Sequence, residues 1–168
     1  FLYNASFKGM YAIHSASILY KEKAWLFSGH SGAGKSTHTN MWKELFNTPV
    51  INGDLNLIDV NTSNGIPVVI GIPWCGTSGI YTSHSYPLGG ITFIKKDSID
   101  KVTQIDSDDA VLSIAQRMIS PCWNTKLLEN NLSASEKIAA KTAVFRLCCT
   151  KNPSSAFLMK EEIDNEYH

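Results

Sequence analysis

The 168-residue chain has no apolar run long enough to cross a bilayer and no net charge, with 15 basic and 15 acidic residues. The first absence argues against a membrane-embedded protein. The second removes the electrostatic reason to expect nucleic acid or an anionic membrane surface as a partner. The chain also shows no signal-peptide pattern and begins at Phe1 rather than Met. We therefore expect one globular domain over 1–168, and we expect it to be a fragment of a longer chain.

Cysteine is scarce as well, with four residues and no C-x-x-C pair. This spacing gives no reason to expect a zinc site. Cys148 and Cys149 are adjacent in an apolar stretch, which predicts a strand with one core thiol and one half-exposed thiol. Free thiols favour a cytoplasmic protein. The N-x-S triplets at Asn4, Asn61 and Asn131 are then chance matches.

One stretch, FSGHSGAGKSTHT, carries a complete chemical motif, because residues 29–36 fit G-x-x-x-x-G-K-[ST]. Its glycines allow successive backbone N–H groups to point at phosphates, and the helix expected after it adds a positive N-terminal end. Lys35 should reach the β- and γ-phosphates of a nucleotide, and the Ser36 hydroxyl should bind Mg²⁺. The predicted nucleotide-binding residues are Gly29, His30, Ser31, Gly32, Ala33, Gly34, Lys35, Ser36 and Thr37.

Mg²⁺ also needs a carboxylate, usually at a strand end beside such a loop. Asp54 lies 19 residues after Lys35, where the next strand should end, and we predict it to be a metal ligand or a base. An Asx turn after Asn52 is its structural alternative. Asp59 competes for the role, but it sits near a turn, where surface solvation is the simpler explanation.

Among the histidines, His14 precedes Lys35 by 21 residues. If the first two strands form a hairpin, His14 lies on the strand next to the loop, where it would touch phosphate or metal. The alternative is an ordinary core or rim histidine. Surface or packing roles are the default for His30 and His38, although His30 is close enough in sequence to approach a phosphate. His84 falls in a polar loop and is not predicted to act.

Hydrophobic periodicity and turn residues predict an α/β protein. The first two strands should form a hairpin across Lys21–Lys23, and the polar segment 73–86 is long enough for a functional loop. One helix should bury Met41, Trp42, Leu45 and Phe46. Strands are expected over 10–20, 24–28, 50–51, 55–60, 66–72, 90–95, 102–105 and 144–150, and helices over 35–46, 107–119, 135–141 and 154–166.

The order IHSASILYKEKAWLFSGHSGAGKST resembles the HPr kinase/phosphorylase and phosphoenolpyruvate carboxykinase superfamily, in which a histidine lies about 21 residues ahead of the loop lysine. INGD is similar to the acidic motif of that superfamily, and GIPWCGTSGIY with PLGGITFIKK is similar to a bacterial HPr-kinase-like branch. The resemblance runs from Met10 to Lys96 and continues more weakly to the end. It implies an α/β, P-loop kinase-like fold with a mixed, bent β-sheet flanked by helices.

The resemblance also implies roles for individual residues. Lys35, Asp54 and His14 would be the catalytic residues, Ser36 and Asp54 would bind Mg²⁺, and ATP would be the nucleotide. His14 would lie near the γ-phosphate or the metal. Gly53 departs from the pattern, since it stands where the first of two adjacent acids is usual. Either the base of the relatives is lost here, or Asp54 serves both roles.

The leading hypothesis is an ATP-dependent kinase that phosphorylates a hydroxyl of a peptide, a protein or a small molecule. The resemblance also makes a homo-oligomer compatible with this hypothesis. The alternative is a nucleotide-binding module without catalysis. The E-x-R-G-x-G signature is absent, which counts against HPr as the acceptor. The N-K-x-D motif of GTPases is also absent, which counts against a GTPase. Carboxykinases and nucleoside monophosphate kinases need several arginines, and only Arg117 and Arg146 exist. Arg117 would stabilise charge or form a surface salt bridge, and the loop Gly76–Gly79 would hydrogen-bond the acceptor or remain a plain surface loop.

Overall fold

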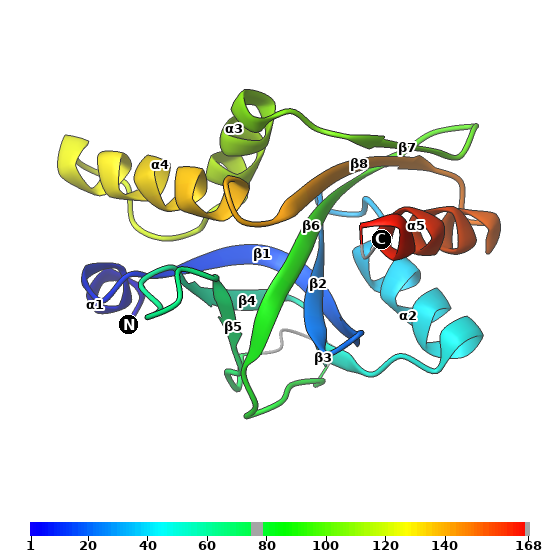
Figure 1. The fold of residues 1–168 in the computed structure, drawn as a ribbon, viewed down its shortest axis with the longest axis horizontal. Helices are drawn as coiled ribbons and strands as arrows, with labels where there is room; N and C mark the ends of the chain where they lie inside the picture. Colours follow the sequence, from blue (N-terminus) through cyan, green and yellow to red (C-terminus); the bar gives the residue numbers. More distant parts are fainter. Residues whose placement is uncertain (75–78, 167–168) are drawn as a thin grey trace.

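The computed structural model describes residues 1–74 and 79–166. Five helices and eight strands are assigned in this part of the chain (Figure 1). They follow the order α1 (Leu2–Phe7), β1 (Met10–Tyr20), β2 (Lys23–Ser28), α2 (Lys35–Phe46), β3 (Val50–Asn52), β4 (Leu55–Asp59), β5 (Val68–Ile70), β6 (Tyr86–Lys96), β7 (Lys101–Gln104), α3 (Ser107–Arg117), α4 (Thr125–Ala139), β8 (Ala143–Cys149) and α5 (Ser154–Asn165).

The sheet mixes parallel and antiparallel pairs. Its strand order is β2-β1-β4-β5-β6-β8-β7, with β3 paired to β1. β6 runs parallel to β2 and β8, whereas the other pairs are antiparallel. Because β2 pairs with both β1 and β6, the pairings form a closed circuit that a flat sheet cannot accommodate. The expectation of a mixed sheet flanked by helices is confirmed.

Strand β1 changes partners in its middle. Met10 to His14 pair with β4, whereas Ser15 to Tyr20 pair with β2. The β1–β2 hairpin closes through Lys21 and Glu22, both with positive φ (50° and 59°). Two successive residues with positive φ are the signature of a turn whose twist matches that of the flanking strands. The partner change places His14 where the two pairings separate.

Helices cover the two faces of the parallel part of the sheet, and a hydrophobic cluster lies under each pair. α3 and α4 pack on one face through Ala110, Ile114, Ala134 and Ile138. α2 and α5 cover the other through Trp42, Ala156, Met159 and Ile163. Figure 1 shows α3 and α4 together at one side of β6 and β8, and α2 and α5 together at the other. Each fully buried large apolar side chain contributes roughly 1.5–3 kcal/mol to this packing.

The paired glycines of β6 make room for an aromatic side chain. A Cβ on Gly89 would lie 2.5 Å from the Trp25 ring, and one on Gly90 would lie 2.7 Å from it. The Trp25 indole Nε1 donates to the Tyr20 carbonyl at 3.1 Å, which fixes the ring. Glycine is therefore required here by close approach, so that β6 can pair beside the loop-bearing strand β2.

Two helices differ from the sequence predictions. The helix expected over 135–141 begins at Thr125, after Asn124, whose side-chain oxygen accepts from the Leu127 amide at 2.9 Å. Two asparagines in its first turns, Asn130 and Asn131, obscured the apolar periodicity. The short helix Leu2–Phe7 was not predicted, and its N-cap Phe1 makes no side-chain cap.

Smaller differences concern strand ends and helix faces. The strand expected over 66–72 is limited to Val68–Ile70, since Pro67 has no amide hydrogen for the ladder. Leu45 was expected in the core but is 40% exposed. His38, which lies on the same helix, is buried instead. Cys149 is buried and Cys148 is half-buried, as predicted. Cys75 lies outside the described residues.

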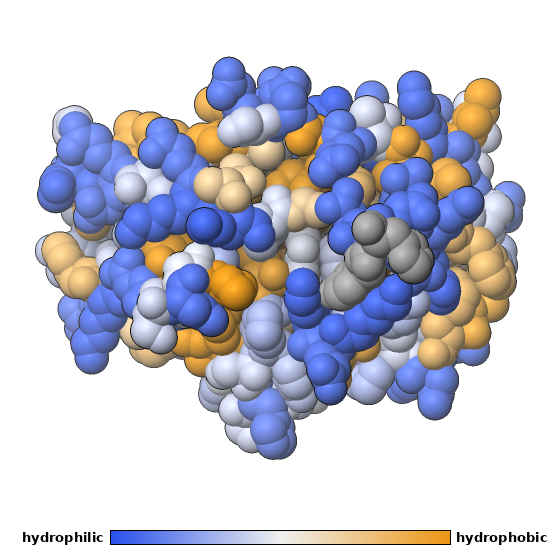
Figure 2. Space-filling model, viewed as in Figure 1, coloured by the Kyte–Doolittle hydropathy of each residue, from blue (hydrophilic) through white to orange (hydrophobic). Residues whose placement is uncertain are grey.

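Polar side chains dominate much of the visible surface. Hydrophilic residues cover a large share of the face shown in Figure 2, and apolar residues form separate areas between them. Within the described residues, no helix combines the length and the apolar character that crossing a membrane requires.

Candidate active site

The loop between β2 and α2 has the backbone of a phosphate cradle. Gly32 and Gly34 have positive φ values of 72° and 107°, and Gly34 is the N-cap of α2 without a side-chain cap. The first-turn amides of α2 therefore have no intrahelical or capping partner. Gly29 is fixed by space, because a Cβ there would lie 2.8 Å from the Ile94 carbonyl oxygen. A chain with these features can receive an anion at the helix start.

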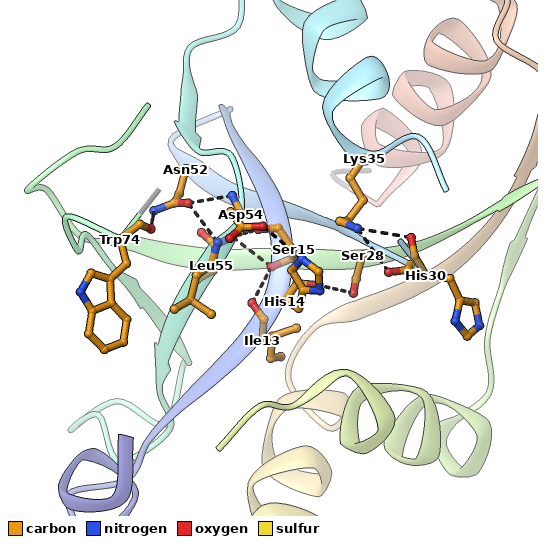
Figure 3. Close-up of polar contacts among 12 residues, drawn as sticks. Ile13, His14, Ser15, Ser28, His30, Lys35, Asn52, Asp54, Leu55 and Trp74 are labelled. Atoms are coloured by element: carbon orange, nitrogen blue, oxygen red, sulfur yellow. Dashed lines mark hydrogen bonds and ion pairs between the residues drawn. The ribbon is translucent and has the colours of Figure 1, made fainter. Parts of the chain in front are cut away.

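Lys35 is the first residue of α2 and folds back over the loop. Its Nζ lies 3.4 Å from the carbonyl oxygens of both Gly29 and His30, the long end of hydrogen-bond distance (Figure 3). Partial burial lowers the pKa of the Lys35 ammonium group, the charge of Asp54 raises it, and that of Arg117 lowers it. Asp54 and Arg117 are thus both close enough to act on Lys35, although each comes from a different part of the chain.

His14 and Asp54 form a polar pair, which is drawn together with this lysine in Figure 3. His14 Nε2 and Asp54 Oδ1 are 3.1 Å apart, and their side chains are 42% and 48% exposed. His14 is paired across the sheet with Leu55. In a regular strand Asp54 would point away from the face that its neighbour Leu55 shares with His14. The break between β3 and β4 is what allows the carboxylate to reach the histidine.

Asn52 fixes this break. Its side-chain oxygen accepts from the backbone amides of Asp54 at 2.9 Å and Leu55 at 3.1 Å. Its side-chain nitrogen donates to the Trp74 carbonyl at 2.7 Å. Asn52 is 3% exposed, so these bonds are shielded from water. The Asx turn considered for Asp54 is therefore made by Asn52, and the Asp54 side chain remains available.

A buried polar network lies behind the pair. The Asn56 side chain donates to the Ser15 carbonyl at 2.7 Å and accepts from the Ser17 hydroxyl at 2.6 Å. The Ser28 hydroxyl donates to the His14 carbonyl at 2.7 Å, which ties the last residue of β2 to the histidine. Satisfied networks of this kind hold a backbone in one conformation. They anchor His14 and the start of the loop to the same framework.

The arrangement fits a cation that is bound partly by phosphate oxygens. The second carboxylate oxygen of Asp54 makes no hydrogen bond with any described residue. Within residues 1–74 and 79–166, no three His, Cys, Asp or Glu side chains lie close enough to hold a metal ion by themselves. Mg²⁺ often takes only one or two protein carboxylates and completes its shell with water and nucleotide phosphates. One free carboxylate beside a phosphate cradle suits that mode of binding.

A cavity of about 300 Å³ opens on the α2 side of the loop. It is lined by the helix start, including Ser36 and Thr37, and by Lys96, Thr150 and Lys151 from the ends of β6 and β8. His38 borders it but is 1% exposed, with Nε2 accepting from the Trp42 indole at 3.1 Å. Its size and position suit the sugar and base side of a nucleotide whose phosphates occupy the loop.

The other residues considered from the sequence have different environments in the structure. Arg117 forms no ion pair with a described residue, which contradicts the surface salt bridge, and its Nη2 lies 2.8 Å from His30 Nε2. Asp59 accepts from the Asn61 amide at 2.8 Å, as expected for an acid at a turn. The His84 side chain is exposed, and among the described residues its hydrogen-bond partner is Thr82. The expected contacts of Gly76–Ser78 lie outside the described residues.

Comparisons with known proteins place this geometry on a known fold. No protein-family model matches the chain, and no curated protein matches it. Among solved structures, the HPr(Ser) kinase/phosphatase from Coxiella burnetii matches with a TM-score of 0.52. The match covers 93% of this chain and 90% of that chain, at 9% sequence identity. The two proteins share a fold. At this identity the likeness carries no residue roles, so the site rests on its own geometry.

Proposed function

We propose that the protein is an ATP-dependent kinase that transfers the γ-phosphate to a hydroxyl group of a peptide, a protein or a small molecule. The observation that supports this most is that the Asp54 carboxylate, held by His14, is close enough for its charge to act on Lys35 at the phosphate cradle. A phosphate held by the loop then has a carboxylate beside it, and a carboxylate in that place is what a transfer reaction needs beyond binding. The shared fold with a kinase/phosphatase agrees with this proposal.

In this proposal each residue has a separate task. Lys35 and the amides at the start of α2 hold the terminal phosphates. Asp54 orients the acceptor hydroxyl and takes its proton, and His14 holds the carboxylate through the 3.1 Å contact. Mg²⁺, bound by Asp54, Ser36 and the phosphates, would neutralise charge that develops during transfer. Such positioning and electrostatics supply most of the acceleration in phosphoryl transfer.

A nucleotide-binding module without transfer is the second candidate. Gly53 favours it, because it leaves Asp54 as the single acid at the break between β3 and β4, where the HPr-kinase-like pattern has two. A single carboxylate engaged by His14 would then serve only to bind a cation. The protein would sense or store nucleotide and pass its signal to a partner.

Radioactive transfer from γ-labelled ATP to serine, serine peptides and small hydroxy acids separates the two candidates. Nucleotide binding is measured in parallel by calorimetry with a non-hydrolysable ATP analogue. We expect Asp54→Asn to lower transfer by about a hundredfold or more while analogue binding changes by only a few fold. Asp59→Asn is the matched control, since it makes the same change at the competing acid and should leave transfer unaltered.

Two results would contradict the kinase proposal. Transfer that survives Asp54→Asn removes the carboxylate from the mechanism. Tight analogue binding that Lys35→Met abolishes, without transfer to any acceptor tested, favours the nucleotide-binding module.

A further inference from the structure

A second cavity, of about 480 Å³, lies on the α3 side of the same loop. The loop residues Gly32 and Ala33 border both this cavity and the one next to α2. The phosphate cradle therefore stands between two separate spaces. A volume of this size suits a small molecule. An enzyme that moves a phosphate between two substrates needs such a pair of spaces, one on each side of the transferred group.

The second cavity is strongly cationic, although the whole chain is neutral. Four side chains with fixed positive charge line it, and both arginines of the chain are among them: Lys95, Lys96, Arg117 and Arg146. Among the described residues that line it, none is Asp or Glu. Ordinary surface cations are interspersed with acids, whereas this group is not. An anion bound in the cavity would relieve the mutual repulsion of these four cations.

The arginines are free to take that anion. Arg146 is exposed on β8, and its side chain forms no hydrogen bond or ion pair with a residue in the described part of the chain. Arg117 contacts His30 through its Nη2 and makes no contact with an acid there. Guanidinium groups bind carboxylates and phosphates through two parallel hydrogen bonds, which gives orientation as well as affinity.

His30 links this cavity to the phosphate-binding lysine, because Lys35 Nζ lies 3.4 Å from the His30 carbonyl oxygen and Arg117 Nη2 lies 2.8 Å from His30 Nε2. Arg117 is close enough to lower the pKa of Lys35, which holds the phosphates in the proposed function. The residue after it, Met118, forms a bridge with Ile13, beside His14. A molecule bound by both arginines would thus have one end beside Lys35 and near the strand that carries His14.

We propose that this arginine cavity, defined by His30, Lys95, Lys96, Arg117 and Arg146, binds the phosphate acceptor as a small hydroxyl-bearing molecule with a carboxylate or phosphate group. The proposal rests on the proposed kinase function and narrows its substrate class. The acceptor oxygen forms a bond to the γ-phosphorus, and the bond from that phosphorus to the β–γ bridging oxygen breaks. ADP leaves with the electron pair, and the hydroxyl proton passes to Asp54.

Three probes with the same three-carbon frame test the inference: glycerate, glycerol 3-phosphate and uncharged glycerol. Each is titrated by calorimetry into protein saturated with Mg²⁺ and a non-hydrolysable ATP analogue, so that the loop is already filled. We expect one or both anions to bind and glycerol to show no heat. Arg146→Gln should weaken anion binding by at least about tenfold, because a charge-assisted contact is lost. The tighter anion identifies which acidic group the cavity prefers.

Two further variants guard the interpretation. Lys126→Gln removes one positive charge from an exposed position on α4 outside the cavity and should leave anion binding unaltered. Arg146→Lys retains the charge but loses the bidentate contact. Its affinity for the anion should therefore lie between those of the wild type and Arg146→Gln. Thermal unfolding followed by circular dichroism confirms that each variant is folded.

Failure of the inference is separable from failure of the kinase proposal. The inference is overturned if the anions bind no tighter than glycerol, or if Arg146→Gln leaves their affinity unchanged. Either result counts against it even if the protein transfers phosphate. The inference is also overturned if Arg146→Gln weakens binding of the ATP analogue, because the cavity would then hold the nucleotide. If the analogue does not bind at all, the kinase proposal fails, and titration of the anions into the free protein still tests the cavity.

Discussion

His14 Nε2 and Asp54 Oδ1 lie 3.1 Å apart where strand β1 exchanges one partner for another. The contact depends on two irregularities. β1 leaves β4 after His14 and joins β2 at Ser15, and the adjoining strand is interrupted between Asn52 and Leu55. Both irregularities place polar side chains at the mouth of the phosphate loop, whereas regular strands would have buried or separated them.

Substitution of His14 by alanine should slow phosphate transfer without preventing nucleotide binding. The Asp54 carboxylate would lose its partner and sample other rotamers, so we expect a decrease in kcat of about tenfold or more. Binding of the ATP analogue should change by less than about threefold, since the loop amides and Lys35 are intact. Steady-state kinetics and calorimetry check the two quantities.

His84→Ala is the control for that substitution, because the His84 side chain is exposed and hydrogen-bonds Thr82 rather than a carboxylate. It should leave both kcat and analogue binding unaltered. Equal losses in the two variants, or a His14→Ala variant with normal kcat, would show that the contact with Asp54 has no part in transfer.

Asn52 should matter for transfer although it does not face the phosphate. Asn52→Ala removes the two bonds to the amides of Asp54 and Leu55 and the bond to Trp74. The free energy of unfolding should fall by about 1–3 kcal/mol, because buried groups lose their partner. A positioning role predicts a lower kcat with little change in KM at temperatures where the variant is fully folded.

Asn64→Ala provides the comparison in a similar turn. The Asn64 side chain accepts from the Ile66 amide at 3.0 Å, but this turn is exposed and far along the chain from the loop. Its substitution should cost less stability and leave kcat intact. Loss of stability without loss of kcat in Asn52→Ala would limit Asn52 to a structural role.

The loop and its flanking elements were predictable from the sequence because local chemistry determines them. Glycines that permit positive φ, followed by Lys35 and Ser36, predict the cradle and the helix start wherever they occur after a strand. The strand Met10–Tyr20 and the helix Lys35–Phe46 were predicted with the observed bounds. Spacing along the chain also brought His14 and Asp54 into consideration, although it gave no contact between them.

The other parts of the site depend on packing that no local pattern records. The pairing of β6 with β2 and β8 brings Arg146 of β8 beside the loop, and the bridge between Met118 and Ile13 holds Arg117, at the end of α3, next to it. Asn52 carried a signal, since Asn-Gly predicts a turn, but the sequence does not say which carbonyl its side chain will meet. The asparagine-rich start of α4 likewise became helical through burial of Leu127 and Asn131 on its inner side.

The β1–β2 turn can be stabilised by one substitution. Glu22 has a φ of 59°, a region that glycine adopts without steric cost. Relief of the strained φ stabilises the folded state, whereas the larger entropy of glycine in the unfolded chain offsets part of that gain. The net rise in the free energy of unfolding for Glu22→Gly should be about 0.5–1 kcal/mol. Denaturant titration at neutral pH measures the change.

A matched substitution tests the conformational explanation for that turn. Glu44 lies in helix α2, and Glu44→Gly should destabilise the protein by about 1 kcal/mol, since glycine is unfavourable within a helix. If both variants lose stability, release of the positive φ is not the dominant effect at Glu22.

Acid should destabilise the protein partly through His38, which packs between α2 and the sheet. Its side chain is 1% exposed, Nε2 accepts from Trp42, and Nδ1 has no partner among the described residues. Burial lowers the pKa of His38 from 6.5 to about 4, against a smaller opposing effect of Asp100. Between these two values the unfolded chain binds a proton that the folded protein does not.

The free energy of unfolding should therefore fall as the pH drops below about 6.5 and level off near pH 4 as far as this residue is concerned. At pH 5 the contribution lost is about 2 kcal/mol relative to pH 7.5. In His38→Gln the amide cannot take up a proton, so the decrease between the two pH values should shrink by about that amount, although the variant starts from lower stability. Denaturant titrations at pH 5 and pH 7.5 give both numbers. His84→Gln, at an exposed site, should retain the full wild-type decrease, and a His38→Gln variant with that same decrease would contradict the assignment to His38.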